Sequence, residues 1–156
     1  MKENINLKEK LTEHFTLGEL IKTSVKTSDG NIPSEEHIRN LKRICAWLEL
    51  LRARWNELYG EGDEPIIINS GYRSPKVNKA VGGVAWSNHL TGCAVDIRVF
   101  GQEQLLRYAT ILLDISDSLN DLFDELLLEH STNGVYWLHF AVRPPEQGNR
   151  RRIRII

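Results

Sequence analysis

Apolar residues recur with a helical period over one long stretch in the first half of the chain. They occur every three to seven positions, at Ile38, Leu41, Cys45, Leu48, Trp55 and Leu58. This spacing places them on one face of an α-helix. Ser34 is a suitable N-cap for this helix, and Gly60 is a suitable end. We therefore predict a long amphipathic helix between these two residues, with one buried face.

Three further helices are predicted from capping signals and periodicity. Thr16, followed three positions later by Glu19, forms a capping-box pattern at the start of a short helix. Ser74 precedes a proline, which suits the first helical position, so a second short helix begins there. Residues 102–113 indicate another helix. Residues 23–33 are rich in Ser, Thr, Asp, Gly and Pro and are predicted to form a loop.

Most strand-like segments lie in the second half of the chain. Short β-branched or apolar runs predict strands at 66–69, 93–100, 125–129 and 136–142, with an edge strand at 152–156. Because helices come first and most strands follow, the pattern favours an α+β fold. We expect a single domain over residues 1–156. Its helical part covers about 15–60, and a part carrying the candidate chemistry covers about 65–145.

Composition limits the class of protein and its partners. The chain has 156 residues, of which 41% are hydrophobic and 26% charged, as in a soluble globular domain. Its net charge of -1 does not point to nucleic acid. The arginine-rich segment 150–154 is interpreted as a solvated strand end, with a weak patch for an anionic polymer as the alternative. Cys45 and Cys93 are too few for a disulfide framework, so buried apolar roles are expected.

The first residues are polar and lack the apolar core of a secretory signal, and no run is long enough for a membrane span. We expect a protein that is cytoplasmic as synthesised and does not interact with a membrane. Release by a route independent of a signal peptide is the alternative. A monomer is the default expectation.

Three residues could together bind a metal ion. His89 and Asp96 lie seven positions apart, with Gly92 between them, and His139 lies in a later strand. Zinc accepts imidazole nitrogen and carboxylate oxygen, and a catalytic zinc site uses three protein ligands and one open position. The spacing alone is not specific. A packed histidine and an ion-paired aspartate in strands are the alternative.

A larger set of motifs resembles the zinc D-Ala-D-Ala carboxypeptidase family of murein peptidases. The resemblance rests on Ser70-Gly71-Tyr72-Arg73-Ser74, Asn78, Gly82-Gly83, Ser87-x-His89-x-x-Gly92-x-Ala94-x-Asp96, Trp137-x-His139 and the upstream Phe15-Thr16-Leu17-x-Glu19-Leu20. It covers nearly the whole chain. The resemblance implies a hedgehog-like core, with a small, mostly antiparallel sheet flanked by helices.

The resemblance also implies roles for individual residues. His89, Asp96 and His139 match the ligands of one Zn²⁺ per chain. Arg73 matches an arginine that steadies a substrate carbonyl or carboxylate, as its planar guanidinium can. Ser87 matches a substrate-contacting serine, although a hydroxyl bonded to its own loop is the alternative. Tyr72 is predicted to line the same cleft or, alternatively, to belong to the core.

One position departs from the family pattern. Many members carry a carboxylate three residues before the last zinc ligand, where it acts as general base, and this chain has Tyr136 there. Glu129 is the best substitute as base, with orientation of a zinc-bound imidazole as its alternative role. His130, and after it Glu125 and Asp124, are weaker candidates for the base.

The resemblance implies a zinc metallopeptidase that hydrolyses peptide bonds in peptidoglycan stem peptides, as a carboxypeptidase or an endopeptidase. A phage-type endolysin fits this expectation. The missing acid at position 136 leaves open a catalytically silent, zinc-containing peptidoglycan-binding module. A signalling or interaction domain on the same scaffold is a third possibility.

Overall fold

The computed structural model describes residues 5–156, and in this part of the chain a five-stranded sheet organises the fold. In spatial order the strands are β3 (Ile68–Ser70), β4 (Ala94–Arg98), β6 (Tyr136–Ala141), β5 (Glu125–His130) and β7 (Arg152–Ile155). Neighbouring strands are antiparallel, except that β7 runs parallel to β5. The sequence-based expectation of an α+β fold with a mostly antiparallel sheet is confirmed.

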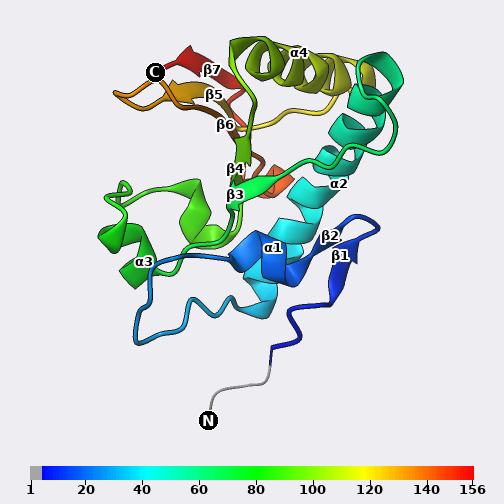
Figure 1. The fold of residues 1–156 in the computed structure, drawn as a ribbon. Coiled ribbons are helices and arrows are strands. Elements are labelled where there is room, and N and C mark those ends of the chain that lie inside the picture. Colours follow the sequence, from blue (N-terminus) through cyan, green and yellow to red (C-terminus); the bar gives the residue numbers. More distant parts are fainter. Residues whose placement is uncertain (1–4) are drawn as a thin grey trace.

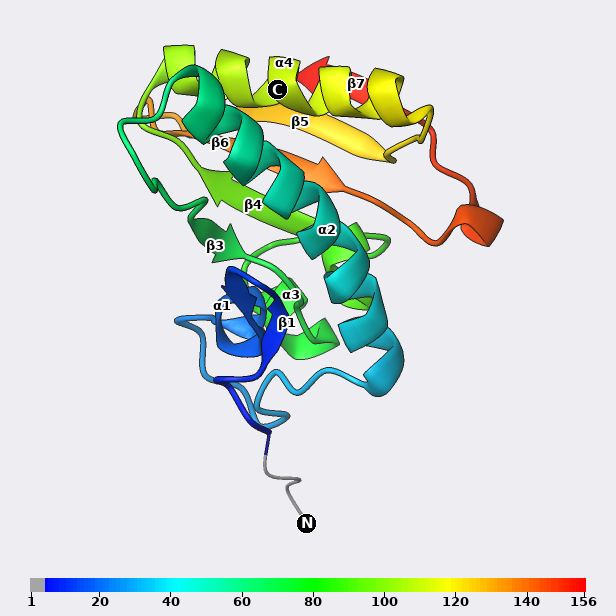
Figure 2. The same cartoon turned by 90° about the vertical axis from the view of Figure 1, so that its right-hand side faces the viewer.

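Helices of very different length surround this sheet. They are α1 (Leu17–Ile21), α2 (Glu35–Leu58), α3 (Pro75–Ala80) and α4 (Gln102–Leu119), with the 3-10 helices η1 (Asn88–Thr91) and η2 (Pro145–Gln147). A small hairpin of β1 (Lys10–Thr12) and β2 (Phe15–Thr16) precedes α1. Helices α2 and α4 cover one face of the sheet, and α3 lies toward the other (Figures 1 and 2). No helix in residues 5–156 is long and apolar enough to cross a bilayer.

Alternation along the strands separates a core face from a polar face. The core side chains of β4, β6 and β5 are Val95, Ile97, Leu138, Phe140, Leu126 and Leu128. They pack under the two long helices, where Trp47 of α2 meets Phe140 with ring centroids 5.5 Å apart. Burying one such side chain stabilises the fold by about 1.5–3 kcal/mol. Because successive side chains point to opposite faces, the intervening polar residues lie together on the other face.

The predicted helix starts are confirmed in detail. Thr16 and Glu19 form a reciprocal capping box at α1. At α2 the Ser34 hydroxyl accepts from the backbone N–H of His37, whose ring bonds back to Ser34 N. The last predicted helix was too short, because α4 continues to Leu119 and ends at a left-handed Asn120. The short strands β1 and β2 and helix η1 were not predicted.

Arginines of the segment 150–154 form ion pairs with acidic neighbours. Arg150 pairs with Asp124 at 2.9 Å, and Arg151 pairs with Asp117 at 2.7 Å. These contacts favour the interpretation as a strand end over that of a free basic patch. Cys45 and Cys93 are buried free thiols, as expected. Burial raises the pKa of both thiols, so neither is an activated nucleophile.

Candidate metal centre

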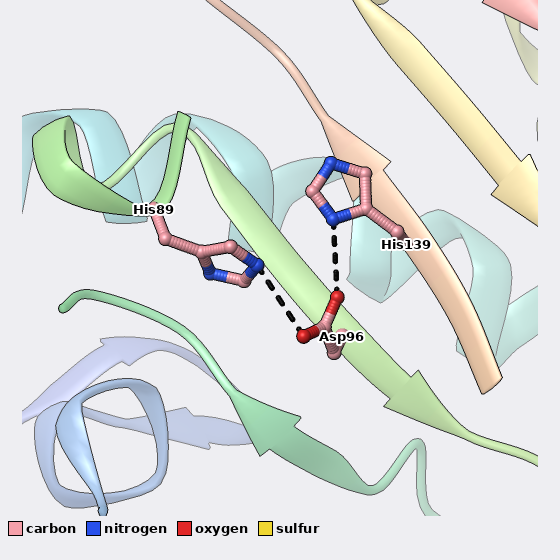
Figure 3. A group of neighbouring side chains, drawn as sticks. All are labelled: His89, Asp96 and His139. Atoms are coloured by element: carbon pink, nitrogen blue, oxygen red, sulfur yellow. Dashed lines mark hydrogen bonds and ion pairs between the residues drawn. The ribbon is translucent and has the colours of Figure 1, made fainter. Parts of the chain in front are cut away.

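His89, Asp96 and His139 meet on the polar face of the sheet. Asp96 on β4 lies directly opposite His139 on β6 in the antiparallel register, and His89 reaches them from η1. One potential ligand atom from each residue lies within 4.8 Å of the other two. Figure 3 shows both imidazole rings directed toward the Asp96 carboxylate. All three side chains are at most 13% exposed.

The turn that carries His89 depends on its two ends. Ser87 is the N-cap of η1, and its Oγ accepts from the backbone N–H of His89 at 3.2 Å. Gly92 ends the turn with a φ of +75°, a conformation that glycine adopts without strain. A side chain at this position would also come within 2.6 Å of the His37 carbonyl oxygen. The glycine between the two predicted ligands is thus required by the turn that brings them together.

Hydrogen bonds to the outer side of each ring identify the nitrogens available to a metal. His89 Nδ1 lies 2.7 Å from the Gly71 carbonyl oxygen, which can only accept, so this nitrogen carries the proton. His139 Nε2 lies 3.1 Å from Glu125 Oε1. The remaining nitrogens, His89 Nε2 and His139 Nδ1, are 3.3 and 3.1 Å from the Asp96 oxygens. Metal-binding histidines commonly hold their second nitrogen in this way, so the donor set fits zinc.

The three groups also perturb one another's protonation. Burial alone would raise the pKa of Asp96, but the two neighbouring imidazoles outweigh it and hold this pKa well below its usual range. Burial would lower the pKa of His139, but hydrogen bonds and charge from Asp96 and Glu125 raise it to about 9. The carboxylates therefore favour positive charge between them, which is the environment that a divalent cation requires.

Arg73 approaches the centre from the loop before α3. Its Nη2 donates to Asp96 Oδ2 at 3.1 Å, and its Nε donates to Ser70 Oγ at 3.1 Å. Arg73 lines the same cleft as the three candidate ligands. It thereby restrains Asp96, a contact that sequence reasoning did not foresee. Its role toward a substrate stays a prediction.

The ligands lie in a cleft with a volume of about 460 Å³. Three of its lining residues, Glu125, Leu127 and Glu129, come from alternate positions of β5. Burial raises the pKa of the Glu129 carboxyl, although charge from His139 opposes the shift. The hydrogen bond with His139 lowers the pKa of Glu125. The cleft thus contains two glutamates with opposite electrostatic environments.

The other candidate residues are placed less directly. Ser87 lines the cleft, and its hydroxyl accepts a hydrogen bond within its own turn, as expected for the alternative, structural role of this serine. Tyr72 is buried in the core and stacks on His37 with centroids 4.8 Å apart, and within residues 5–156 the cleft lining does not include it. His130 is exposed and bonds to the Ser131 carbonyl. Asp124 is enclosed by arginines.

Two features of the cleft were missed by sequence reasoning. Val81, Val84 and Trp86 form an apolar wall from the loop after α3, and their exposed fractions are 46%, 51% and 78%. Asn88 also lines the cleft and is almost fully buried. The apolar wall could have been suspected from the unusual tryptophan in a glycine-containing loop. The position of Asn88 beside His89 gave no signal of its own.

Two buried histidines and a buried aspartate that line a cleft, with further carboxylates nearby, form a candidate metal centre of the kind found in metal-dependent hydrolases. Comparison with known families agrees, because the Peptidase M15 model matches residues 13–113, well over half of the chain. The chain belongs to the Peptidase M15 family. The matched range includes His89 and Asp96, whereas His139 joins them through the β4–β6 register.

A curated relative points in the same direction. The chain is similar to the zinc D-Ala-D-Ala carboxypeptidase of Streptomyces albus G, with 33% identity over 85 residues. The match covers 54% of this chain and 31% of that protein. The chain therefore spans only about a third of the relative's length.

Proposed function

We propose that the protein is a zinc metallopeptidase that hydrolyses peptide bonds in peptidoglycan stem peptides, as a carboxypeptidase or an endopeptidase. The observation that carries the proposal is the convergence of His89 Nε2, Asp96 and His139 Nδ1 in the cleft. Membership of the Peptidase M15 family supports peptide hydrolysis. The name of the Streptomyces relative supports zinc and D-alanyl peptides.

Zinc bound to these ligands would supply a Lewis acid that polarises the scissile carbonyl and lowers the pKa of water to about 7. The chain's own residues supply the remaining chemistry. Glu129 accepts a proton from the attacking water while the oxygen of that water bonds to the carbonyl carbon. It then donates this proton to the nitrogen as the C–N bond breaks. The partly buried position of its carboxyl, with a raised pKa, suits both transfers.

Arg73 and Ser87 complete the proposed site. Both line the cleft beside the ligands. The Arg73 guanidinium has donors beyond those bonded to Asp96 and Ser70, so it can also bind a substrate carbonyl or a terminal carboxylate. Ser87 contributes a hydroxyl near the first ligand.

A silent peptidoglycan-binding module is the competing function, because position 136, where many relatives carry a base, is a tyrosine. Zinc content and hydrolysis of purified peptidoglycan, measured together, separate the two functions. We expect one zinc per chain and released peptides for the wild type, and neither for His89→Ala. His14→Ala is the matched control. It also removes a histidine that contacts a carboxylate, but this carboxylate, Glu49, belongs to α2 and not to the candidate metal centre.

Each outcome has a defined meaning. Zinc without hydrolysis would favour the binding module, and a wild type without zinc would overturn the metal centre. Mass spectrometry of the released fragments identifies the bond that is cut. The proposal places the site of action at the cell wall, which fractionation of cells producing the protein would test.

A further inference from the structure

Asn88, the residue before the first proposed zinc ligand, lies at the centre of a buried polar cluster. Asn88 is only 7% exposed. Its Nδ2 lies 2.8 Å from Asp124 Oδ2 and 2.8 Å from Glu125 Oε1. Its Oδ1 accepts from Arg143 Nε at 2.9 Å. Both ends of the amide are therefore satisfied within the protein.

The contact with Glu125 links this cluster to the metal centre. Glu125 Oε1 is also 3.1 Å from His139 Nε2, so one oxygen contacts both Asn88 and the last ligand. The main chain of Asn88 continues directly into His89. Its carbonyl accepts from the Cys93 N–H at 2.9 Å, which closes the turn that holds His89. A single residue is thus connected to both histidines.

We propose that Asn88 is a positioning residue that couples the two histidine ligands by fixing the orientation of Glu125. The proposal rests on the metal centre proposed above. Asn88 lines the cleft, but its amide is hydrogen-bonded to Asp124, Glu125 and Arg143 rather than to a proposed zinc ligand. It acts through the carboxylate that hydrogen-bonds His139.

The other side of the cluster provides a rigid support. Asp124 is fully buried, and Arg150 binds it through two side-chain bonds of 2.9 and 3.0 Å and through its backbone N–H at 3.1 Å. Arg143 Nε is 3.2 Å from the same carboxylate. Asn88 is therefore held by groups that are themselves fixed.

The chemistry of an amide explains why an asparagine suits this position. Asp124 and Glu125 are adjacent carboxylates, and the amide presents two N–H donors between them without adding charge. Aspartate here would place a third negative group against the first two. Alanine would leave Glu125 with only His139 and the more distant arginines as partners. Loss of Glu125, the direct partner of a proposed metal ligand, would by general experience cost about 10–100-fold in metal affinity, and loss of the residue that orients Glu125 should act through the same contact.

The test is a double-mutant cycle of zinc affinity, measured by competition with a chelator on the full chain. We expect Asn88→Ala and Glu125→Ala each to weaken zinc binding about tenfold or more, and the double variant to be little weaker than either single one. Co²⁺ absorption spectra should show the same altered geometry in all three. Asn40→Ala is the matched control, because buried Asn40 donates to the Thr91 carbonyl of the same turn at 2.8 Å without contacting Glu125.

Several outcomes would overturn the coupling. Zinc affinity unchanged in Asn88→Ala, or additive losses in the double variant, would do so while leaving the metal centre intact. An equal loss in Asn40→Ala would show a merely structural role. If Asn88→Ala does not fold, Asn88→Ser takes its place in the cycle under the same criteria. A wild type that binds no zinc would overturn both this inference and the proposed function.

Discussion

Glu125 and Glu129 project from the same face of β5 into one cleft, and of these two glutamates it is Glu125 that hydrogen-bonds a proposed zinc ligand. Glu125 Oε1 lies 3.1 Å from His139 Nε2, whereas Glu129 lies two pleat repeats further along β5, opposite Trp137. The two glutamates therefore suit different tasks. We propose that Glu125 orients the imidazole of His139 and that Glu129 exchanges a proton with substrate or water.

This division predicts different effects of two isosteric substitutions. Glu129→Gln should lower kcat about 10²–10⁴-fold, the usual contribution of a general base, with zinc content unchanged. Glu125→Gln should chiefly weaken zinc binding, because it alters the partner of His139. Steady-state kinetics and metal analysis of both variants provide the measurement. Full activity in Glu129→Gln would exclude this residue as the base.

Zinc binding should depend on pH through His139. In the metal-free protein its neighbouring carboxylates raise the pKa of His139 to about 9, so zinc must displace a proton below that pH. Zinc affinity should therefore fall about tenfold for each unit of pH decrease below about 9. Chelator competition at several pH values measures this slope. A flat profile between pH 6 and 8 would contradict the proton displacement.

The arginine-bound Asp124 should contribute to stability in acid. Burial would raise the pKa of Asp124, but Arg150, Asn88 and Arg143 outweigh it and lower this pKa from 3.8 to about 2. A folded-state pKa below the unfolded one stabilises the protein above pH 4, and this contribution is lost as pH falls from about 4 to about 2. We expect about 2 kcal/mol at neutral pH from this shift.

Asp124→Asn tests this contribution directly. Urea unfolding of the metal-free protein should show a lower free energy of unfolding for the variant at pH 7. The difference from the wild type should shrink toward pH 2, because the wild-type carboxyl then takes up its proton. A difference that stays constant over this range would show that the charge of Asp124 is not responsible.

The apolar wall should contribute to substrate binding. Trp86 is 78% exposed at the cleft, where a substrate can cover it. We expect Trp86→Ala to raise KM about fivefold with kcat little changed, the size of a typical aromatic contact. Phe100→Ala is the control, since Phe100 is 68% exposed but packs beside Arg98. An equal KM for Trp86→Ala and the wild type would exclude this contact.

Sequence reasoning singled out the three candidate ligands but could not show how they meet. The turn through Gly92 is local, so the placement of His89 near Asp96 follows from a few neighbouring residues. The meeting of Asp96 with His139 depends on pairing between strands separated by a long helix. No local pattern encodes that register; the family resemblance strengthened the grouping of His139 with the other two candidate ligands, and the structure supplies the register.

The roles of the polar partners were harder still to predict. Glu129 ranked above Glu125 as a base because it lies at the strand end. The alternation of β5 places both on the same face, so only side-chain geometry separates them. Asn88 and Asp124 acquire their partners only in the folded chain, where Arg143 contacts Asn88, Arg150 contacts Asp124, and Asn88 bonds to Asp124 and Glu125.

The pairing of Asp96 with His139 makes the metal centre a reporter of folding accuracy. The two residues face each other in adjacent strands, and a shift of either strand by one position would turn its ligand to the opposite face of the sheet. A molecule with the wrong register could keep most of its secondary structure and still be unable to bring Asp96 and His139 to the same metal ion. If the proposed zinc site is correct, the fraction of refolded protein that binds zinc would measure the fraction with the native strand register. Circular dichroism alone would not distinguish native from misregistered molecules.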